Sequence, residues 1–316
     1  MSETPPAPGT LRTALAFTSC TLIWGSTFLV IRIGDDTVPP MWAAALRLVL
    51  AALMMTAIVT LRRRAFPRGR ALRAAAGFGL FQFGVNMPLL YWAETGVPSG
   101  LAAVVYGTVP ITSALIASWA GLETLEPVKM VGSLVALGGV VVLFRDRLAT
   151  PATALPVLAV YFATVSASLG SVLLKRGPRQ DPMAANAVGA AVGAPVCLLA
   201  SLLLHEQRTW PTRANEIVPI LYLAIVGSVG AFVIFAWLVG HWKVSSVSFI
   251  GVVVPVIALT LGALVRGEEF HRGHLAGSAL VTAGVLLAIW SDRRAARIAA
   301  IAPSGRPVAT RGRVRS

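Results

Sequence analysis

Arg47 is the residue whose type and position point most directly to chemistry. It lies about six residues inside an apolar segment, roughly 9 Å along a helix axis, and no other basic residue lies so far from a segment end. In a membrane-spanning helix a charge at that depth is costly and indicates a functional site, here one for an anionic group. The alternative is structural, with the long side chain reaching outward to Asp35 or Asp36. The sequence leaves both interpretations open.

The acidic residues argue against one class of carrier. All 13 Asp and Glu residues fall in the termini, in predicted loops or at segment ends. A carrier that exchanges organic cations for protons needs a carboxylate inside its cavity to bind the two in turn. The sequence therefore disfavours export of cationic drugs and favours a solute with a polar or anionic end. It shows no side chain for proton coupling, so facilitated efflux is permitted.

Aromatic and amide side chains inside the apolar segments are further candidates for binding a solute. Their polar groups need hydrogen-bond partners in lipid, so each lines a polar cavity or packs between helices. Together with Arg47, the predicted substrate-binding residues are Trp24, Asn86, Tyr106, Tyr161 and Trp237.

The remaining titratable residues do not form an enzyme site. The four histidines lie at segment ends or in loops, and the pair His271 and His274 has helical spacing without a further metal-ligand motif. There is no phosphate-binding glycine motif and no titratable pair in the middle of a segment. We therefore expect no catalytic residue, no metal and no cofactor. The two cysteines, Cys20 and Cys197, are expected to be small buried residues.

Composition places the chain in a membrane. Apolar residues make up 56% of it and charged residues 13%, against about 45–50% and 25% in soluble proteins. Apolar runs near 20 residues recur along the length, and each is long enough to cross a hydrocarbon core of about 30 Å. The sequence therefore predicts an all-α integral membrane protein.

The apolar runs number ten. A short segment, 1–10, precedes them, and a basic tail, 292–316, which we expect to be disordered, follows them. Five spans fall in residues 11–146 and five in residues 153–291. The predicted spans are 11–33, 41–61, 71–92, 98–119, 128–145, 153–174, 183–204, 217–240, 244–265 and 273–291.

The two groups of five spans are copies of one another. At a constant shift of 145 residues, Trp92 meets Trp237, Pro110 meets Pro255 and Glu123 meets Glu268. Five is an odd number, so the second copy enters the membrane upside down. Two inverted copies form a cavity at their interface near the midplane, which is typical of secondary transporters.

The repeated prolines and glutamates receive different interpretations. Pro110 and Pro255 lie near the middle of spans four and nine, where a proline bends a helix; we expect them to shape the cavity or act as hinges. Glu123 and Glu268 precede the next helix, where a carboxylate favours the positive end of the helix dipole. We interpret the two glutamates as structural.

Loop charge predicts the orientation. With both termini in the cytoplasm, 19 of the 27 Lys and Arg residues fall on the cytoplasmic side. The net charge of +14 is then explained by anionic lipid of the inner leaflet, and nucleic-acid binding is not expected.

The run 22–28, Leu-Ile-Trp-Gly-Ser-Thr-Phe, resembles the EamA family of the drug/metabolite transporter superfamily, as do Arg47 in span two and the region of Pro110 and Glu123. The resemblance covers roughly 14–144 and 155–290, although Ser168–Ser171 replaces the Trp-Gly-Ser opening in the second copy. It implies ten helices in two repeats and export of small metabolites or amino acids.

The function predicted from these observations is alternating-access export of a small polar metabolite, an amino acid or related organic acid, across the cytoplasmic membrane. Multidrug or cation efflux is the alternative, followed by a non-transporting membrane scaffold. The glycines of spans five and ten, Gly132 and Gly139 with Gly277 and Gly284, either join these spans within one chain or form a homodimer.

Overall fold

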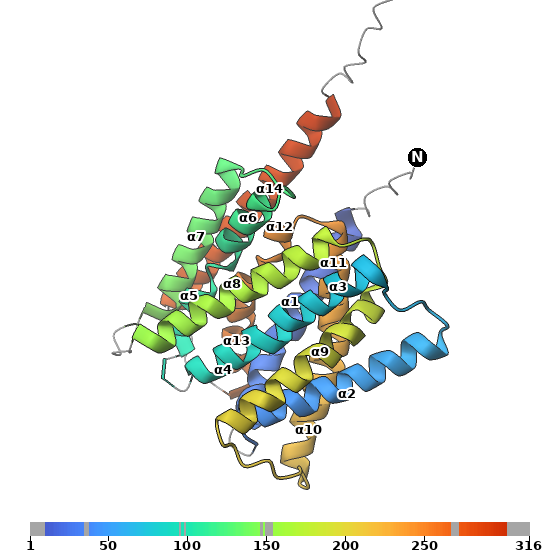
Figure 1. The fold of residues 1–316 in the computed structure, drawn as a ribbon. Helices are drawn as coiled ribbons and strands as arrows, with labels where there is room; N and C mark the ends of the chain where they lie inside the picture. Colours follow the sequence, from blue (N-terminus) through green and yellow to red (C-terminus); the bar gives the residue numbers. More distant parts are fainter. Residues whose placement is uncertain are drawn as a thin grey trace, which may run out of the picture.

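The computed structural model describes residues 10–34, 38–94, 96–97, 99–145, 148, 154–266 and 272–301. Every regular element in these ranges is a helix (Figure 1). The first repeat contains α1 (Thr10–Gly34), α2 (Pro40–Leu61), α3 (Gly69–Gly79), π-helix η1 (Leu80–Val85), α4 (Asn86–Glu94), α5 (Ser99–Tyr106), α6 (Val109–Trp119) and α7 (Pro127–Phe144). The second contains α8 (Ala154–Arg176), α9 (Pro182–Leu203), α10 (Ala214–Tyr222), π-helix η3 (Leu223–Ala231), α11 (Phe232–His241), α12 (Val244–Val247), α13 (Ile250–Arg266) and α14 (Arg272–Ile301).

Eight helical stretches in the described ranges are long and apolar enough to cross a membrane. Two further stretches match the remaining predicted spans: α1, with 25 residues, and the unbroken run of α3, η1 and α4. At 1.5 Å per residue α1 is about 37 Å long. The all-helical membrane fold is confirmed, whereas the number of ten spans stays a prediction.

The two repeats interlock through their first helices. Helix α1 packs against α13 and against α10, η3 and α11 of the second repeat. Helix α8 makes the corresponding contacts with α3, η1, α4 and α6 of the first. The equivalent helices α2 and α9 pair with each other, as do α7 and α14. This exchange of partners is the pattern expected from a pseudo-two-fold axis between two copies.

Polar contacts show that the paired helices run in opposite directions. The Glu206 carboxylate, which follows α9, accepts hydrogen bonds from the backbone N–H groups of Met41 and Trp42 at the start of α2, at 3.1 and 2.9 Å. At the other end of the pair Arg64, after α2, forms an ion pair with Asp181, before α9. The second repeat is therefore inverted relative to the first.

The α7–α14 pair packs through glycine. A Cβ added to Gly284 would lie 2.5 Å from the Gly132 carbonyl oxygen, and one added to Gly139 would lie 2.8 Å from the Gly277 carbonyl oxygen. Only hydrogen fits at such an approach. These glycines therefore join spans five and ten within one chain.

Helix breaks are placed differently in the two repeats. Span four is divided into α5 and α6, and Pro110 is the second residue of α6, where its missing N–H removes no hydrogen bond. In span nine the break falls earlier, between α12 and α13, and Pro255 lies inside α13. Pro110 thus begins a new helix just after the interruption at Gly107–Thr108. A role of the two prolines in shaping the cavity or as hinges stays a prediction.

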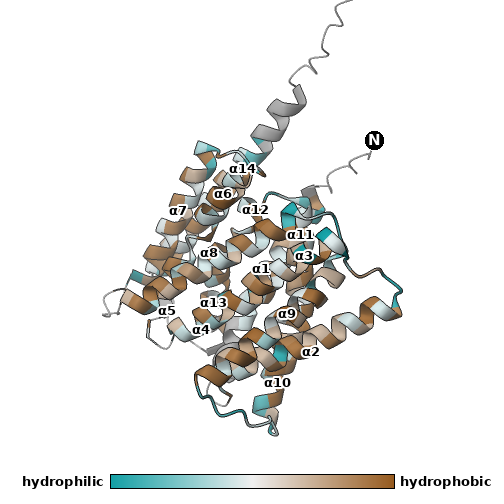
Figure 2. Cartoon of the chain, viewed as in Figure 1, coloured by the Kyte–Doolittle hydropathy of each residue, from teal (hydrophilic) through white to brown (hydrophobic). Residues whose placement is uncertain are grey.

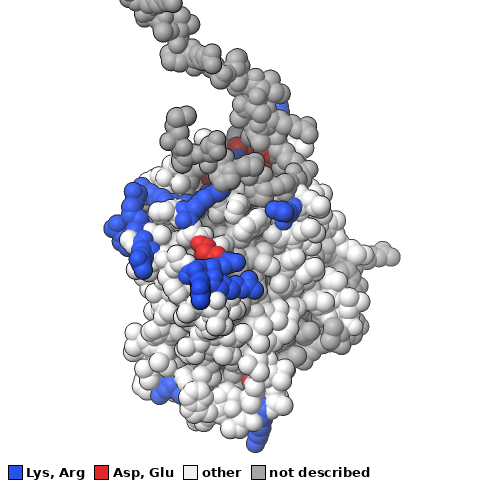
Figure 3. All heavy atoms as spheres, turned by 90° about the vertical axis from the view of Figure 1, so that its right-hand side faces the viewer, with Lys and Arg blue, Asp and Glu red and all other residues white. Residues whose placement is uncertain are grey.

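Hydrophobic residues predominate along the helices (Figure 2), and many large ones are exposed on the outside of the bundle. Large examples include Leu61, Leu203 and Trp119, which are 83%, 68% and 89% exposed. On the face drawn in Figure 3 most blue side chains lie in the upper half of the view, towards one end of the bundle, and a broad region below them carries few charges. We call that end the terminal end; there α1 begins and α14 ends. The other is the distal end.

The segment after residue 291 differs from its prediction. Helix α14 continues to Ile301 instead of giving way to a disordered tail at Asp292. The Arg294 guanidinium lies 5.5 Å from the centre of the Trp290 ring, one turn back on the same helix. Residues 1–9 and 302–316 lie outside the described residues, as do Asp35, Asp36, Glu268 and His271.

Candidate functional site

A cavity of about 50 Å³ lies between the two repeats. If one water needs about 10–15 Å³, the cavity has room for roughly four. Its walls come from α1, η1, α5 and α6 of the first repeat and from α8, α11, α12 and α13 of the second. The residues with polar groups in this lining are Trp24, Gln82, Tyr106, Ser113, Ser171 and Ser248. We call it the central cavity.

A chain of polar groups leads along one wall of the central cavity. The Tyr106 hydroxyl donates to Asn86 Oδ1 at 3.1 Å, and Asn86 Nδ2 donates to the Gln82 carbonyl oxygen at 3.3 Å. Gln82 is 6% exposed, and its side-chain Oε1 has no hydrogen-bond partner among the described residues. A buried acceptor left unpaired is unfavourable, so this oxygen is suited to accept an N–H or O–H from a bound solute.

Serine hydroxyls supply the rest of the polarity. Ser113 Oγ donates to Ser168 Oγ at 2.9 Å, and Ser171 and Ser248 donate to backbone carbonyl oxygens within their own segments. Each hydroxyl donor is thus occupied, while its oxygen lone pairs can still accept. No charged side chain is among the lining residues of the central cavity. Its surface is neutral and rich in hydrogen-bond acceptors.

Trp24 closes one side of the central cavity with an aromatic cluster. Its ring lies 4.8 Å from the Phe232 ring and 5.2 Å from the Phe235 ring, measured between centroids. Its Nε1 donates to the Gly227 carbonyl oxygen at 3.4 Å. The indole of the first repeat is therefore anchored on the second.

Two π-helices lie at equivalent places in the repeats. At the 145-residue shift η1 falls within η3, so spans three and eight carry the same irregularity. Each receives a hydrogen bond from the first helix of the other repeat. Ser166 Oγ donates to the Phe81 carbonyl oxygen at 2.7 Å, as Trp24 does to Gly227. Single π-turns are frequent at functional sites. Here η1 borders the central cavity through Gln82, and η3 accepts the hydrogen bond of Trp24, which lines that cavity.

The structure separates the predicted binding residues. Trp24 and Tyr106 line the central cavity and Asn86 is bonded to Tyr106; solute binding by these three stays a prediction. Tyr161 is not among the lining residues of the central cavity, so its predicted role there is not supported by its position. Its side chain is 45% exposed, because it shares an outward face of α8 with Leu158 and Phe162.

Trp237 also lies away from the central cavity. Its ring stacks on His241, one turn further along α11, with centroids 4.5 Å apart. Trp237 is absent from the lining, so its predicted role there is not supported by this arrangement. Within the described residues no group of three or more His, Cys, Asp or Glu side chains could hold a metal ion.

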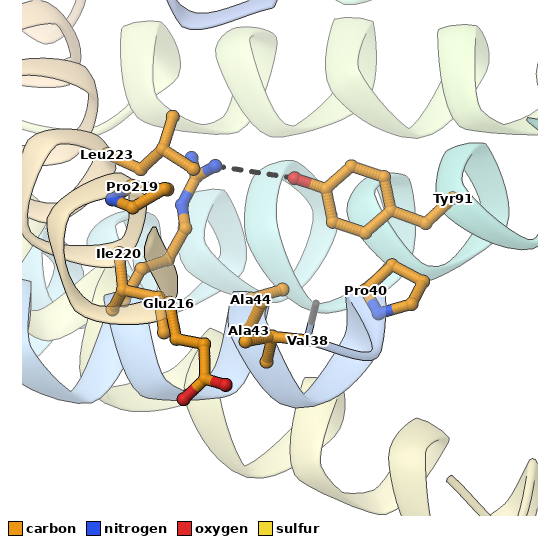
Figure 4. A pocket seen from close by; sticks show the side chains of 10 residues that line it. Val38, Pro40, Ala43, Ala44, Tyr91, Glu216, Pro219, Ile220 and Leu223 are labelled. Carbon is orange, nitrogen blue, oxygen red and sulfur yellow. Dashed lines mark hydrogen bonds between the residues drawn. The ribbon is translucent and has the colours of Figure 1, made fainter. Parts of the chain in front are cut away.

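Arg47 lines a second, separate pocket (Figure 4). This pocket, which we call the distal pocket, is formed by α2, α4, α10 and η3 near the distal end, and its volume is about 20 Å³. Arg47 is 6% exposed, and its Nη1 donates to the Tyr91 hydroxyl oxygen at 3.3 Å. None of the residues lining the distal pocket also lines the central cavity. Arg47 is thus outside the site in which the sequence predicted it.

A buried ion network lies at the terminal end, next to the central cavity. Lys129 Nζ donates to Asp292 Oδ1 and Oδ2 at 3.0 and 3.2 Å and to Ser246 Oγ at 2.6 Å. Lys243 forms ion pairs with Asp292 and with Glu126. We call these side chains the terminal ion network; it joins α7, α12 and α14.

Glu123 binds the same region of the second repeat. Its carboxylate accepts hydrogen bonds from the backbone N–H groups of Val244 and Ser245 and from the Ser245 hydroxyl. These N–H groups belong to the first turn of α12, which has no intrahelical partners for them. Glu123 therefore binds a helix N-terminus, as expected. The helix is α12 of the other repeat instead of α7, which follows Glu123 in the chain.

Two features of the site were missed from the sequence. Gln82 is the only glutamine inside a predicted span, and intramembrane polar residues indicate function by default, so the signal was present. Lys129, at the start of span five, is one of the 19 basic residues that the predicted topology assigns to the cytoplasmic side. Its side chain is nevertheless buried, at 4% exposure. Its partner Asp292 is 163 residues away, and no local pattern marks such a pair.

Known proteins similar to this chain are membrane transporters. The profile of the EamA-like transporter family matches residues 11–145 and 154–290. YedA of Escherichia coli strain K12, an uncharacterized inner membrane transporter, is 30% identical over 254 residues, 79% of this chain and 82% of YedA. A probable amino-acid metabolite efflux pump of Salmonella typhimurium strain LT2 is 27% identical over 290 residues, 88% of this chain and 95% of the pump.

A crystal structure of another protein has the same fold. It superposes with a TM-score of 0.72 over 90% of this chain and 98% of the other, at 21% sequence identity. At that identity the likeness concerns the fold alone.

Proposed function

Since the chain belongs to the EamA-like transporter family, we propose that this membrane transporter exports a small polar metabolite, an amino acid or related organic acid, by alternating access to the central cavity. The observation that carries the proposal is the central cavity itself. It lies between inverted repeats and is lined by neutral acceptors, with the unpaired Gln82 Oε1 among them. The similarity to a probable amino-acid metabolite efflux pump supports the solute class.

Recognition in the central cavity would depend on hydrogen bonds. The ammonium or hydroxyl hydrogens of an amino or hydroxy acid can be donated to Gln82 Oε1 and to the serine oxygens, whereas the aromatic ring of Trp24 covers apolar atoms. Organic cations lack a carboxylate partner among the lining residues. This composition favours a polar metabolite over a cationic drug as the solute.

The terminal ion network provides the barrier on one side. Val244 lines the central cavity, and its neighbours Lys243, Ser245 and Ser246 are bound to side chains of the first repeat. We propose that the terminal end faces the cytoplasm of the cell, in its cytoplasmic membrane, because the predicted topology assigns 19 of the 27 Lys and Arg residues to that side. Solute from the cytoplasm would then enter only when these contacts between the repeats separate.

Counterflow in proteoliposomes tests the proposal. Vesicles containing the full chain are loaded with an unlabelled solute and exposed to a labelled neutral amino acid, a labelled dicarboxylate or a cationic dye. We expect exchange of an amino or organic acid, and at least fivefold slower exchange in Gln82→Met, because one hydrogen bond to the solute is worth about 1 kcal/mol.

The control variant is Gln207→Met, which makes the same change at an exposed loop position and is expected to exchange at the wild-type rate. Exchange of the dye alone would instead support cation efflux. Exchange of no solute would support the scaffold alternative.

A further inference from the structure

Arg47 is a buried cation without a carboxylate partner among the described residues. Its guanidinium has five N–H donors, yet the bond to Tyr91 is the one side-chain hydrogen bond that it makes within the described ranges, where its Nε is also buried without a hydrogen-bond partner. Burying an unpaired charge is strongly unfavourable in a protein and more so in a membrane. An arrangement of this kind calls for an anion that the described part of the chain does not supply.

The acidic residue in the lining of the distal pocket does not supply that anion. The Glu216 carboxylate accepts hydrogen bonds from the backbone N–H groups of Thr212 and Arg213, at 2.8 and 3.2 Å, before the start of α10. In Figure 4 the Glu216 carboxylate points away from the guanidinium that a dashed line joins to the Tyr91 hydroxyl, which is that of Arg47. Glu216 thus stabilises a helix N-terminus and leaves Arg47 uncompensated.

The walls of the distal pocket suit one small anionic group. Besides Arg47, Tyr91 and Glu216, the lining consists of the apolar residues Val38, Pro40, Ala43, Ala44, Pro219, Ile220 and Leu223. Apolar walls reduce solvent screening and so strengthen the attraction between a guanidinium and an anion. A volume of about 20 Å³ has room for one or two water-sized groups, so the distal pocket suits a small anionic group better than a bulky one.

We propose that the distal pocket is a binding site for a small carboxylate, with Arg47 as its cation. Carboxylate fits the planar fork of a guanidinium and can take two N–H donors at once. Tyr91 acts as a positioning residue, because its hydroxyl holds Nη1 from the side. A role of this binding site in transport rests on the proposed function. A solute leaving the central cavity towards the distal end would then present its acid group to Arg47.

Binding can be measured without transport. The purified full chain in detergent is heated in acetate, in chloride and in the bulky anion gluconate, at equal ionic strength, and unfolding is followed by tryptophan fluorescence. A ligand that binds only the folded chain raises the unfolding temperature. We expect acetate to raise it by about 3 °C relative to gluconate, and we expect no such rise in Arg47→Gln.

Arg47→Lys is the second variant, because it keeps the charge and loses the fork; we expect its apparent affinity for acetate to fall about tenfold. Arg208→Gln, at an exposed position, is the matched control and should respond as wild type. An equal rise in chloride would overturn the assignment to a carboxylate. A rise in acetate that persists in Arg47→Gln would overturn the site.

The result can be separated from that of the transport assay. Gln82→Met should slow exchange at least fivefold and keep the response to acetate, because the two cavities share no lining residue. If the wild-type chain exchanges no solute and still binds acetate through Arg47, the site stands and the proposed function fails.

Discussion

The two ends of the bundle differ in the partners that they give to a buried cation. At the terminal end Lys129, 4% exposed, is bonded to both carboxylate oxygens of Asp292 and to Ser246. At the distal end Arg47, 6% exposed, has one phenolic oxygen and an unpaired Nε. The degree of burial is nearly the same, so burial alone does not distinguish a structural charge from a ligand-binding one. Compensation by neighbouring groups does.

The difference also assigns the two cations to different tasks. Lys129 connects α7 of the first repeat with α12 and α14 of the second, and its hydrogen bonds are made within the chain. It thereby holds the repeats together on one side of the central cavity. Arg47 joins no described carboxylate, and under the proposal made above its charge binds the carboxylate of a solute.

The largest effect is expected from Asp292→Asn. The substitution leaves Lys129 and Lys243 without their shared carboxylate in a buried position, and losing one partner of a buried ion pair costs about 3–5 kcal/mol. Chemical denaturation in detergent micelles, followed by tryptophan fluorescence, measures the change in the free energy of unfolding.

The control for Asp292→Asn is Arg64→Gln, which breaks the partly exposed ion pair with Asp181, in which the Arg64 side chain is 46% exposed. Exposed pairs contribute about 0–1 kcal/mol, so the control should change little. Equal effects of the two substitutions would contradict the structural role of the terminal ion network.

An intermediate loss of stability is expected from neutralising a carboxylate of one repeat that binds the start of a helix in the other. Glu123 does so for α12 at the terminal end and Glu206 for α2 at the distal end. Glu→Gln at either position removes charge-assisted hydrogen bonds, at a cost of about 1–2 kcal/mol. Glu123→Gln should cost more, because its carboxylate also accepts from the Ser245 hydroxyl.

Thermal unfolding of the two variants side by side checks that order. If Glu206→Gln is the more destabilising, the distal end is held together more firmly than the described contacts indicate.

The smallest effect is expected from Arg47→Met in a buffer whose anion is too bulky for the distal pocket. Replacing an uncompensated buried charge by an apolar chain of similar length should leave the free energy of unfolding within about 0.5 kcal/mol of wild type or raise it. Lys129→Met, the same kind of change in the compensated pair, should lower it by about 3–5 kcal/mol. A comparable loss in both variants would show that Arg47 has a structural partner and would remove the contrast between the ends.

The candidate site could be predicted in part. Trp24 and Tyr106 were found because a tryptophan and a tyrosine deep in an apolar span need polar partners, and they line the central cavity. Tyr161 satisfies the same description and lies on the outer face of α8. Residue type and depth are readable from the chain, whereas the direction in which a helix face points depends on its neighbours.

Composition and repetition alone determined the class of this protein and its inverted duplication, because apolar run length, the 145-residue shift and an odd span count are properties of the chain itself. The family was indicated by the resemblance of the run 22–28 and its accompanying residues. Tertiary structure decided the rest. It brought Lys129 to Asp292 across 163 residues, aligned two π-helices with donors from the opposite repeat and put Arg47 in a pocket separate from the central cavity. Which side chains meet between helices follows from the register and rotation of packed helices, and these are set by close contacts such as Gly284 on Gly132, not by any local pattern.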